Sequence, residues 1–505
     1  MTRESVVRQE ILLKPGDPWD VLKIQESERN LRSIGSFRKV EISSSAASGG
    51  ELRIATQDAW TLNPQFSVGT EGGDHFVIAG IEENNLLGRG KSVSAFRSQF
   101  GPRVRNEYRY GDPRLFGSRH RFAGLFGTTV RGESFGADLA RPFFELDAPS
   151  AHEIRWFRIV NEDVLYEASE DFSKFTSSYR TLQAEAGRRL PFGGDWTHRA
   201  EAGWYYDKAD FHPTVDTRAG TLPARRELSG PLAGWSWVQP RYLRENGVNT
   251  MDRDEDYNLG NEMKFLAGFA GKEFSSDRDA ALYNFIEQQG LSLGPGRFAL
   301  ARLGAAGRVS RGRSENQLLS GNLNFVFKIP EPLPQTLVVH GELNLGKNLD
   351  GENQVLLGGN TGLRGYKNHS FAGAKSLLFN AESRFFFPEI PGAAFRRVNS
   401  LFRLGAAAFF DAGAAVPEGS GFSPARFKSD IGIGLRAVAT RSRHGNLLRI
   451  DLAYALNRGP GSDRLVFSLR GGQAFDFFSS SSRKVRQSPA SSLAEAAGPE
   501  FPSIR

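Results

Sequence analysis

One pentapeptide in the chain has the form of a hydrolase nucleophile. Residues 132–136 read Gly-Glu-Ser-Phe-Gly, the GxSxG pattern in which Ser134 would attack an acyl carbon. That chemistry requires a buried strand before the serine and a helix directly after it. The residues that follow, ADLARPFFELDAP, contain Pro142 and an aromatic pair and favour a strand instead. We therefore predict no catalytic role for Ser134, and no enzymatic activity.

Cofactor chemistry finds little support in the sequence. Gly90, Lys91 and Ser92 resemble the end of a phosphate-binding loop, but Asn85 stands where the first glycine is required. The chain has no cysteine, and its 8 histidines show no HExxH spacing. We expect no disulfide, metal site, nucleotide or other cofactor.

A third set of residues combines an arginine with two acids. Arg364 lies in the glycine-rich segment GGNTGLRGYKNHSFAG, within the tetrad Leu363, Arg364, Gly365 and Tyr366. Glu382 and Asp411 follow in NAESRFFFP and FFDAG. A guanidinium group pairs bidentately with carboxylates, so Arg364 could bind both acids and fix its loop. The alternative is that each charge is separately hydrated.

Alternating residue types predict the strands that would position these acids. In RLGAAAFFDAG, the apolar residues Leu404, Ala406, Ala408 and Phe410 share one face and leave Asp411 on the other. Glu382 alternates in the same way with its neighbours. The late segments DIGIGLRAVA, RIDLAYALN and RLVFSLRGG each have one apolar face and one small or polar face, a pattern typical of membrane-spanning barrels.

Composition agrees with a mainly β protein. Hydrophobic residues make up 39%, and no apolar run approaches the roughly 18 residues that a spanning helix needs. The chain has 56 glycines and 39 phenylalanines but only 3 methionines, which suits short strands and tight turns. We predict a transmembrane antiparallel β-barrel over residues 62–478, with about 16 strands if each takes about 10 residues. Lys and Arg total 64 against 57 acids, an excess too small to predict nucleic-acid binding.

Residues 1–58 have a different pattern and predict a small α+β domain. A short helix at about residues 4–12 precedes an amphipathic helix from Val21 that ends before Gly35. The segments FRKVEI and ELRIAT then predict a β-hairpin. The N-terminus lacks the apolar core of a signal peptide, so we expect a mature form or a fragment of a longer precursor.

These motifs, in this order, resemble the BamA/TamA superfamily, also called the bacterial surface antigen family. The tetrad Leu363–Tyr366 is similar to the (V/I)RG(F/Y) motif of that family's lumen loop, with a conservative departure at its first position. FFDAG is similar to the family's FxDxG strand, and Glu382 stands where the family has a second lumen acid. DYNLGNEMKF looks like a mid-barrel strand, and residues 1–58 resemble a POTRA domain that lacks its first strand.

The end of the barrel offers a further match. Arg470, Gly472, Phe475 and Phe477 are similar to the signal found in the last strand of outer-membrane barrels, so we expect closure there. Glycine and phenylalanine abound in this chain, and a chance match is the alternative. Residues 479–505 are rich in Ser, Ala and Pro without hydrophobic periodicity, and we predict a disordered tail.

The resemblance implies an outer-membrane protein of a Gram-negative bacterium, with the POTRA-like domain in the periplasm. It implies insertion or translocation of other proteins through a weakly paired seam between the first and last strands. Its partners would be unfolded outer-membrane or secreted clients, membrane lipids, and periplasmic or lipoprotein accessory subunits, but no nucleic acid. The alternatives are a dedicated secretion pore of the two-partner type and a passive outer-membrane channel.

Overall fold

The chain is mainly β structure. The computed structural model describes residues 1–34, 36–45, 51–71, 74–100, 103–249, 254–330, 334–387, 401–439, 447–460 and 464–471. Among these residues, neither α-helix is long and apolar enough to cross a bilayer. Short 3-10 turns occur at Leu115–Gly117, Lys272–Phe274, Gly359–Thr361 and Pro424–Arg426.

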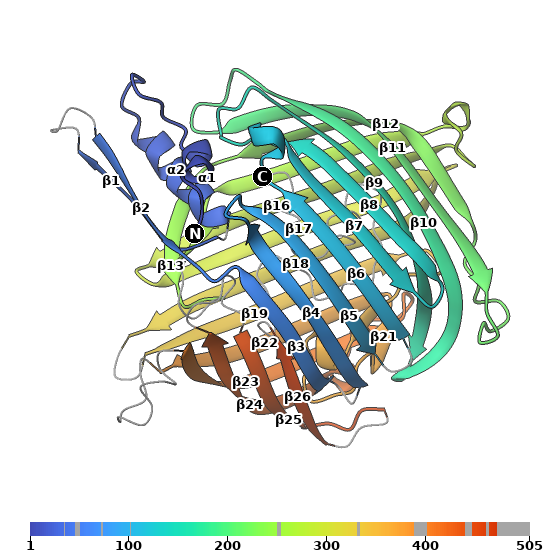
Figure 1. Cartoon of the computed structure of the whole chain (residues 1–505). Helices are drawn as coiled ribbons and strands as arrows, with labels where there is room; N and C mark the ends of the chain where they lie inside the picture. Colours follow the sequence, from blue (N-terminus) through green and yellow to red (C-terminus); the bar gives the residue numbers. More distant parts are fainter. Residues whose placement is uncertain are drawn as a thin grey trace.

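Within the described residues, twenty strands form one antiparallel sheet in which the last strand neighbours the first, so the sheet closes into a barrel (Figure 1). The strands are β3 (Leu62–Glu71), β4 (Asp74–Leu86), β5 (Lys91–Phe100), β6 (Arg103–Asp112), β7 (Arg121–Thr129), β8 (Gly132–Arg141), β9 (Ser150–Glu167), β10 (Glu170–Arg189), β11 (Thr197–Pro213), β12 (Arg226–Val238), β15 (Asn261–Ala270), β16 (Ala280–Gly294), β17 (Arg297–Ser310), β18 (Arg313–Ile329), β19 (Gln335–Lys347), β22 (Lys375–Phe386), β23 (Phe402–Val416), β24 (Lys428–Ala439), β25 (Leu447–Ala455) and β26 (Leu465–Gly471).

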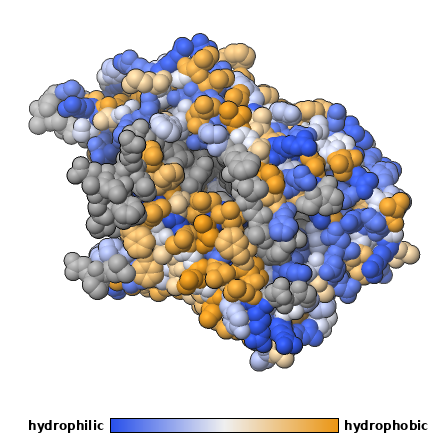
Figure 2. Space-filling view, turned by 60° about the horizontal axis from the view of Figure 1, so that its bottom comes forward, coloured by the Kyte–Doolittle hydropathy of each residue, from blue (hydrophilic) through white to orange (hydrophobic). Residues whose placement is uncertain are grey.

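The barrel strands carry their apolar side chains outward. On β24, Ile433 is 66% exposed while Arg436 is 1% exposed, and β25 buries Asp451 while exposing Leu452. Figure 2 shows hydrophobic residues gathered across the face that the strands at the bottom of Figure 1 present. A water-soluble protein would bury such residues, because each contributes about 1.5–3 kcal/mol when it leaves water. The alternation read from the sequence is confirmed, and it matches a sheet surrounded by lipid.

The strand count exceeds the expected value of about 16. The expected count assumed longer connections between strands. Several hairpins instead turn in two residues, at 130–131, 168–169, 295–296 and 311–312. At 168–169 and 311–312 both turn residues have positive φ, the geometry of the tight turns that match strand twist. The residues saved in these turns form additional strands.

Residues 1–58 fold into the predicted order of two helices and a hairpin. The elements are α1 (Glu4–Glu10), α2 (Val21–Ser33), β1 (Phe37–Ser45) and β2 (Glu51–Asp58). The Asp20 side chain caps α2 by accepting hydrogen bonds from the backbone N–H groups of Leu22 and Lys23. Leu31 packs under the hairpin against Phe37 and Val40. We call this segment the N-terminal unit.

The N-terminal unit is attached to one end of the barrel at several turns. Glu10 pairs with Arg114, which lies between β6 and β7. Glu26 accepts a hydrogen bond of 2.9 Å from the backbone N–H of Leu146, between β8 and β9. These contacts join the N-terminal unit to separate parts of the barrel rim, so it does not hang from a single linker.

Two short hairpins stand apart from the barrel sheet. They are β13 (Tyr242–Asn246) with β14 (Asp254–Asn258), and β20 (Val355–Leu357) with β21 (Phe371–Gly373). DYNLGNEMKF was expected to be one strand, which is wrong: it is divided between β14 and β15. The division falls at Gly260, where a Cβ would lie 1.9 Å from the backbone oxygen of Gln239.

Part of the predicted C-terminal signal can be placed. Arg470 lies in β26. Gly472, Phe475 and Phe477 lie outside the described residues, as does the predicted tail at 479–505.

Candidate functional site

A long connection between β19 and β22, residues 348–374, folds into the barrel. We call it the lumen loop. The tetrad lies in the connection between the two strands of its hairpin β20–β21, and Leu363 and Tyr366 are 0% exposed. Both pack against wall residues that include Leu378 and Ala455. The burial of the tetrad holds Arg364 against the inner surface of the sheet.

Arg364 binds the two acids named from the sequence. Its Nε and Nη2 donate to the two carboxylate oxygens of Asp411 on β23, at 2.7 and 2.8 Å. Its Nη1 donates to Glu382 on β22 at 2.5 Å. The guanidinium carbon also lies 3.4 Å from the ring centroid of Phe409. A bidentate pair, a second carboxylate and a stacked ring together restrict the guanidinium to one orientation.

Further charges on the wall surround this contact. Arg384 donates from Nε to Glu382 at 3.0 Å, and Arg436 on β24 binds Asp451 at 2.6 Å. The Asn380 amide donates to Asp411 at 2.7 Å and to the backbone oxygen of Gly362 at 2.7 Å. All of these charged groups are buried, so each depends on its partners for the solvation that water would otherwise supply. We call Arg364, Glu382 and Asp411 the arginine clamp.

The other tetrad residues fix the backbone of the lumen loop. A Cβ on Gly365 would lie 2.5 Å from the Cβ of Asp430, so no larger residue fits without displacement. The Tyr366 hydroxyl is 2.9 Å from the backbone oxygen of Ser429 and 3.1 Å from that of Asn457. The glycine allows the close approach, and the tyrosine holds the loop against β24 and the end of β25.

A second ionic contact holds the start of the lumen loop, with its charges reversed. Arg308 on β17 donates to both carboxylate oxygens of Asp350, at 3.0 and 2.5 Å. Arg226 on β12 reaches Asp350 and Glu352, each at 2.9 Å. At the arginine clamp the loop supplies the cation, whereas here the wall supplies it. The lumen loop is therefore tied to the wall at two separated places.

Sequence reasoning named the three members of the arginine clamp but did not show which charges pair with one another around it. Strand alternation already placed Arg436, Arg449 and Asp451 on the inner face. What was missing was the register, which sets Gly434 opposite Asp451. A Cβ at Gly434 would lie 2.0 Å from an oxygen of Asp451, so that glycine provides space for the pair. The spacing of inward charges along the sequence does not supply this register.

Ser134 lies in a different environment from a catalytic serine. It is within β8, with strand β9 following, and its hydroxyl oxygen accepts a 3.2 Å hydrogen bond from the backbone N–H of Val160. Because a nucleophile elbow requires a strand, a sharp turn and a helix, this geometry does not present the hydroxyl to a substrate.

Comparisons with known proteins show what the sequence and the fold resemble. No family model matches the chain. A segment of 231 residues, 41% of the chain, is 23% identical to the outer membrane protein assembly factor BamA of Neisseria meningitidis serogroup B. The chain is a BamA/TamA-like outer-membrane barrel. The matched segment spans only 28% of the length of that relative.

Solved structures align with this chain at low sequence identity. BamA from Haemophilus ducreyi, in a form lacking POTRA domains 1–3, aligns with 93% of this chain and 82% of its own, at 13% identity and a TM-score of 0.42. CdiB from Acinetobacter baumannii aligns with 93% of this chain and 71% of its own, at 13% identity and a TM-score of 0.46.

Proposed function

We propose that this BamA/TamA-like barrel inserts or translocates other outer-membrane or secreted proteins. The observation that carries the proposal is the arginine clamp, which fixes the tip of an inward-folded loop against β22 and β23. These strands lie three and four places from the seam between β26 and β3. A loop held there braces the wall beside the seam.

The seam is where a client would engage. Breaking the pairing of β3 and β26 would expose a strand edge, which templates an incoming strand by β-augmentation. Pro64 supports this role for β3, because proline lacks a backbone donor and is confined to edge strands or bulges. A barrel imperfectly matched to the bilayer would also thin it locally and lower the barrier to insertion.

We propose that residues 1–58 form the POTRA-like domain of a barrel spanning residues 62–478, and that this domain faces the periplasm of a Gram-negative bacterium. Its clients would be unfolded outer-membrane or secreted proteins. Membrane lipids and accessory subunits would be further partners. Two helices followed by a hairpin, placed directly before the first barrel strand, support this assignment.

The test is to deplete the protein and complement it with variants, measuring outer-membrane protein levels by quantitative proteomics. Arg364→Ala leaves Asp411 and Glu382 buried with fewer partners, and breaking a buried pair in this way costs about 3–5 kcal/mol. We expect client levels to fall although the variant itself reaches the membrane. Arg311→Ala, at an exposed arginine in the β17–β18 turn, is the matched control.

The pattern of loss identifies the type of client. A decrease in many barrels would mean general assembly, and loss of one exported protein would mean a dedicated secretion pore. Client levels equal to those of the parent strain in Arg364→Ala, with the variant folded in the membrane, would refute the proposed role of the arginine clamp.

A further inference from the structure

The hairpin β13–β14 connects β12 to β15 without joining the barrel sheet. It lies at the end of the barrel at which the N-terminal unit is attached, where Figure 1 places β13 near α1 and α2. A connection of this length is not needed to join neighbouring antiparallel strands, since other hairpins here turn in two residues. Its position suggests a function of its own.

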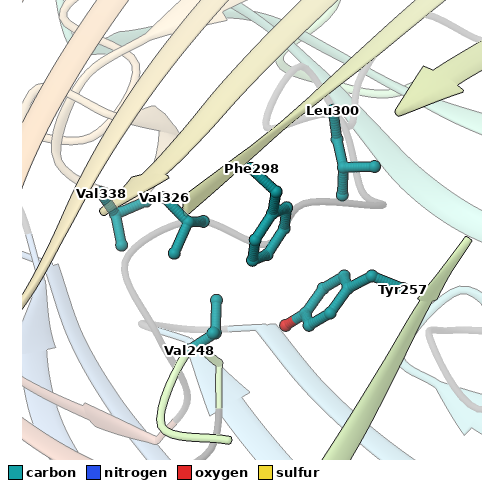
Figure 3. Close-up of a cluster of buried hydrophobic side chains, with 6 residues drawn as sticks. All are labelled: Val248, Tyr257, Phe298, Leu300, Val326 and Val338. Atoms are coloured by element: carbon teal, nitrogen blue, oxygen red, sulfur yellow. The ribbon is translucent and has the colours of Figure 1, made fainter. Parts of the chain in front are cut away.

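The hairpin packs inside the barrel. Val248 and Tyr257 contact Phe298, Val326 and Val338, which line the inner face of β17, β18 and β19 (Figure 3). The rings of Tyr257 and Phe298 are 4.9 Å apart, and Val248 is 0% exposed. Apolar residues facing the lumen are thus covered by the hairpin, which gives the hairpin a stable seat.

Polar contacts lock the same seat. Lys328 on β18 pairs with Glu245 at 2.9 Å and donates to the backbone oxygen of Asn246 at 2.9 Å. The hydroxyl of Thr336 donates to the backbone oxygen of Gly247 at 3.1 Å. The bond from Thr336 gives a donor to a backbone oxygen that is buried, that of Gly247.

One wall residue joins the hairpin to the arginine clamp. Arg384 donates from Nη1 to the backbone oxygen of Val248 at 2.5 Å, and from Nε to Glu382 at 3.0 Å. Glu382 in turn binds Arg364. The guanidinium group of Arg384 therefore contacts the hairpin on one side and a clamp carboxylate on the other. Movement of Val248 would remove a bond from the residue that helps to hold Glu382.

The opposite side of the hairpin is bound to the N-terminal unit. Arg32 of α2 donates from Nε and Nη2 to the two oxygens of Asp256, both at 2.8 Å. Arg244 on β13 donates to Glu28 of α2 at 3.1 Å. The side chains of Arg32 and Asp256 are 15% and 18% exposed, in contrast to the buried contacts deeper in the barrel. Among the contacts that run from α2 through the hairpin to the arginine clamp, the one with the N-terminal unit is therefore the most accessible to water.

We propose that the β13–β14 hairpin is a plug that couples the N-terminal unit to the lumen loop. Displacing α2 from Asp256 loosens the hairpin, and the loss of the Val248–Arg384 bond then weakens the arginine clamp. Coupling of this kind is reciprocal, so release of Arg364 also loosens the hairpin. The inference goes beyond the proposed function and does not depend on the identity of any client.

Thiol labelling tests the first step. The chain has no cysteine, so Val248→Cys introduces a single reactive group in the full-length protein. We expect slow reaction with a polar maleimide in the purified, folded protein, and about fivefold faster reaction when Asp256→Ala or Arg32→Ala is added, the factor expected for a partly exposed ion pair. The double charge exchange Arg32→Asp with Asp256→Arg should restore slow labelling. Heat-modifiable gel mobility confirms that each barrel is folded.

A second reporter tests the coupling. Leu363→Cys places the thiol in the lumen loop, and Asp256→Ala should raise its labelling rate although the two positions do not touch. Adding Arg384→Gln should remove the effect of Asp256→Ala at position 363 while leaving it at position 248. If Asp256→Ala leaves the labelling of Leu363→Cys unchanged, the hairpin is only a local support and the proposal is wrong. No client is present in this assay, so its failure is separable from failure of the proposed function.

Discussion

At the scale of single residues, two members of the tetrad contribute in different ways. Arg364 supplies the charge, and Gly365 supplies the space that lets the backbone lie against Asp430. Gly365→Ala should therefore damage the site without removing any charge, because its Cβ would lie 2.5 Å from the Cβ of Asp430 and 3.2 Å from the backbone nitrogen of Ala455. We expect a loss of client assembly similar to that of Arg364→Ala, measured by the same proteomics.

Gly351→Ala is the matched control, since it lies in the same loop. A Cβ there would lie 3.4 Å from Pro223, an ordinary contact. If Gly365→Ala assembles clients as well as Gly351→Ala does, the close approach at Asp430 has no functional importance.

The sequence was sufficient to name Arg364, Glu382 and Asp411, because their motifs resemble those of the BamA/TamA superfamily and strand alternation independently places the two acids on the inward face. It was not sufficient to find Arg384, which faces inward two residues after Glu382 and joins it to the β13–β14 hairpin. Pairing across distant elements depends on register and on how a connection folds, and neither is encoded in a local pattern. Phe409 was missed for the same reason, because its ring stacks on the Arg364 guanidinium only once the lumen loop is folded against the wall.

At the scale of elements, the lumen loop has two anchors of opposite polarity. Asp350 faces both Arg226 and Arg308, so Asp350→Ala leaves two buried cations short of a partner. Arg308→Ala leaves Asp350 still paired with Arg226. We predict that Asp350→Ala destabilises the loop more than Arg308→Ala, with a cost toward the upper end of about 3–5 kcal/mol.

Limited proteolysis of the folded barrel, followed by mapping of the cut sites, measures this effect. Cleavage within residues 348–357 should increase in the order parent, Arg308→Ala, Asp350→Ala. Equal cleavage of the two variants would show that Arg226 does not compensate for the loss of Arg308.

Strand prediction succeeded where alternation was strong and failed where a connection had strand-like composition. The alternation in β24 and β25 is confirmed by burial, residue by residue. The segment 256–265 was misread because its polar and apolar residues continue across Gly260 with no obvious break. Only the approach of the Gln239 backbone reveals why the chain turns there.

At the scale of the whole molecule, the barrel places its charges inside and its apolar residues outside. Ile433 lies on the outer face of β24, and a charge at such a position costs about 2–4 kcal/mol near the bilayer midplane. Ile433→Lys should therefore lower the stability of the folded barrel in lipid vesicles, measured by urea titration. Val215→Lys, at a fully exposed position after β11, should have little effect. Equal stability of the two variants would mean that Ile433 does not contact lipid.

The two ends of the barrel are occupied by segments that the wall residue Arg384 joins inside. The lumen loop enters between β19 and β22, the β13–β14 hairpin enters from the end that carries the N-terminal unit, and Arg384 contacts the hairpin and a clamp acid together. This arrangement predicts a barrel that conducts ions poorly at rest, unlike an open porin. In planar bilayers, replacing residues 243–257 with a short Gly-Ser linker should increase single-channel conductance, because it removes the apolar plug and one bond to Arg384.

Asp256→Ala should produce brief openings to the same level, since it weakens the seat of the hairpin without removing it, whereas Arg311→Ala should leave the traces unchanged. Conductance that is high in the parent, or unaffected by the linker, would mean that the hairpin does not close the lumen. The lumen loop alone would then be the barrier, and Arg364→Ala would be the variant expected to open it. The two results separate a barrel closed from the end that carries the N-terminal unit from one closed by the arginine clamp.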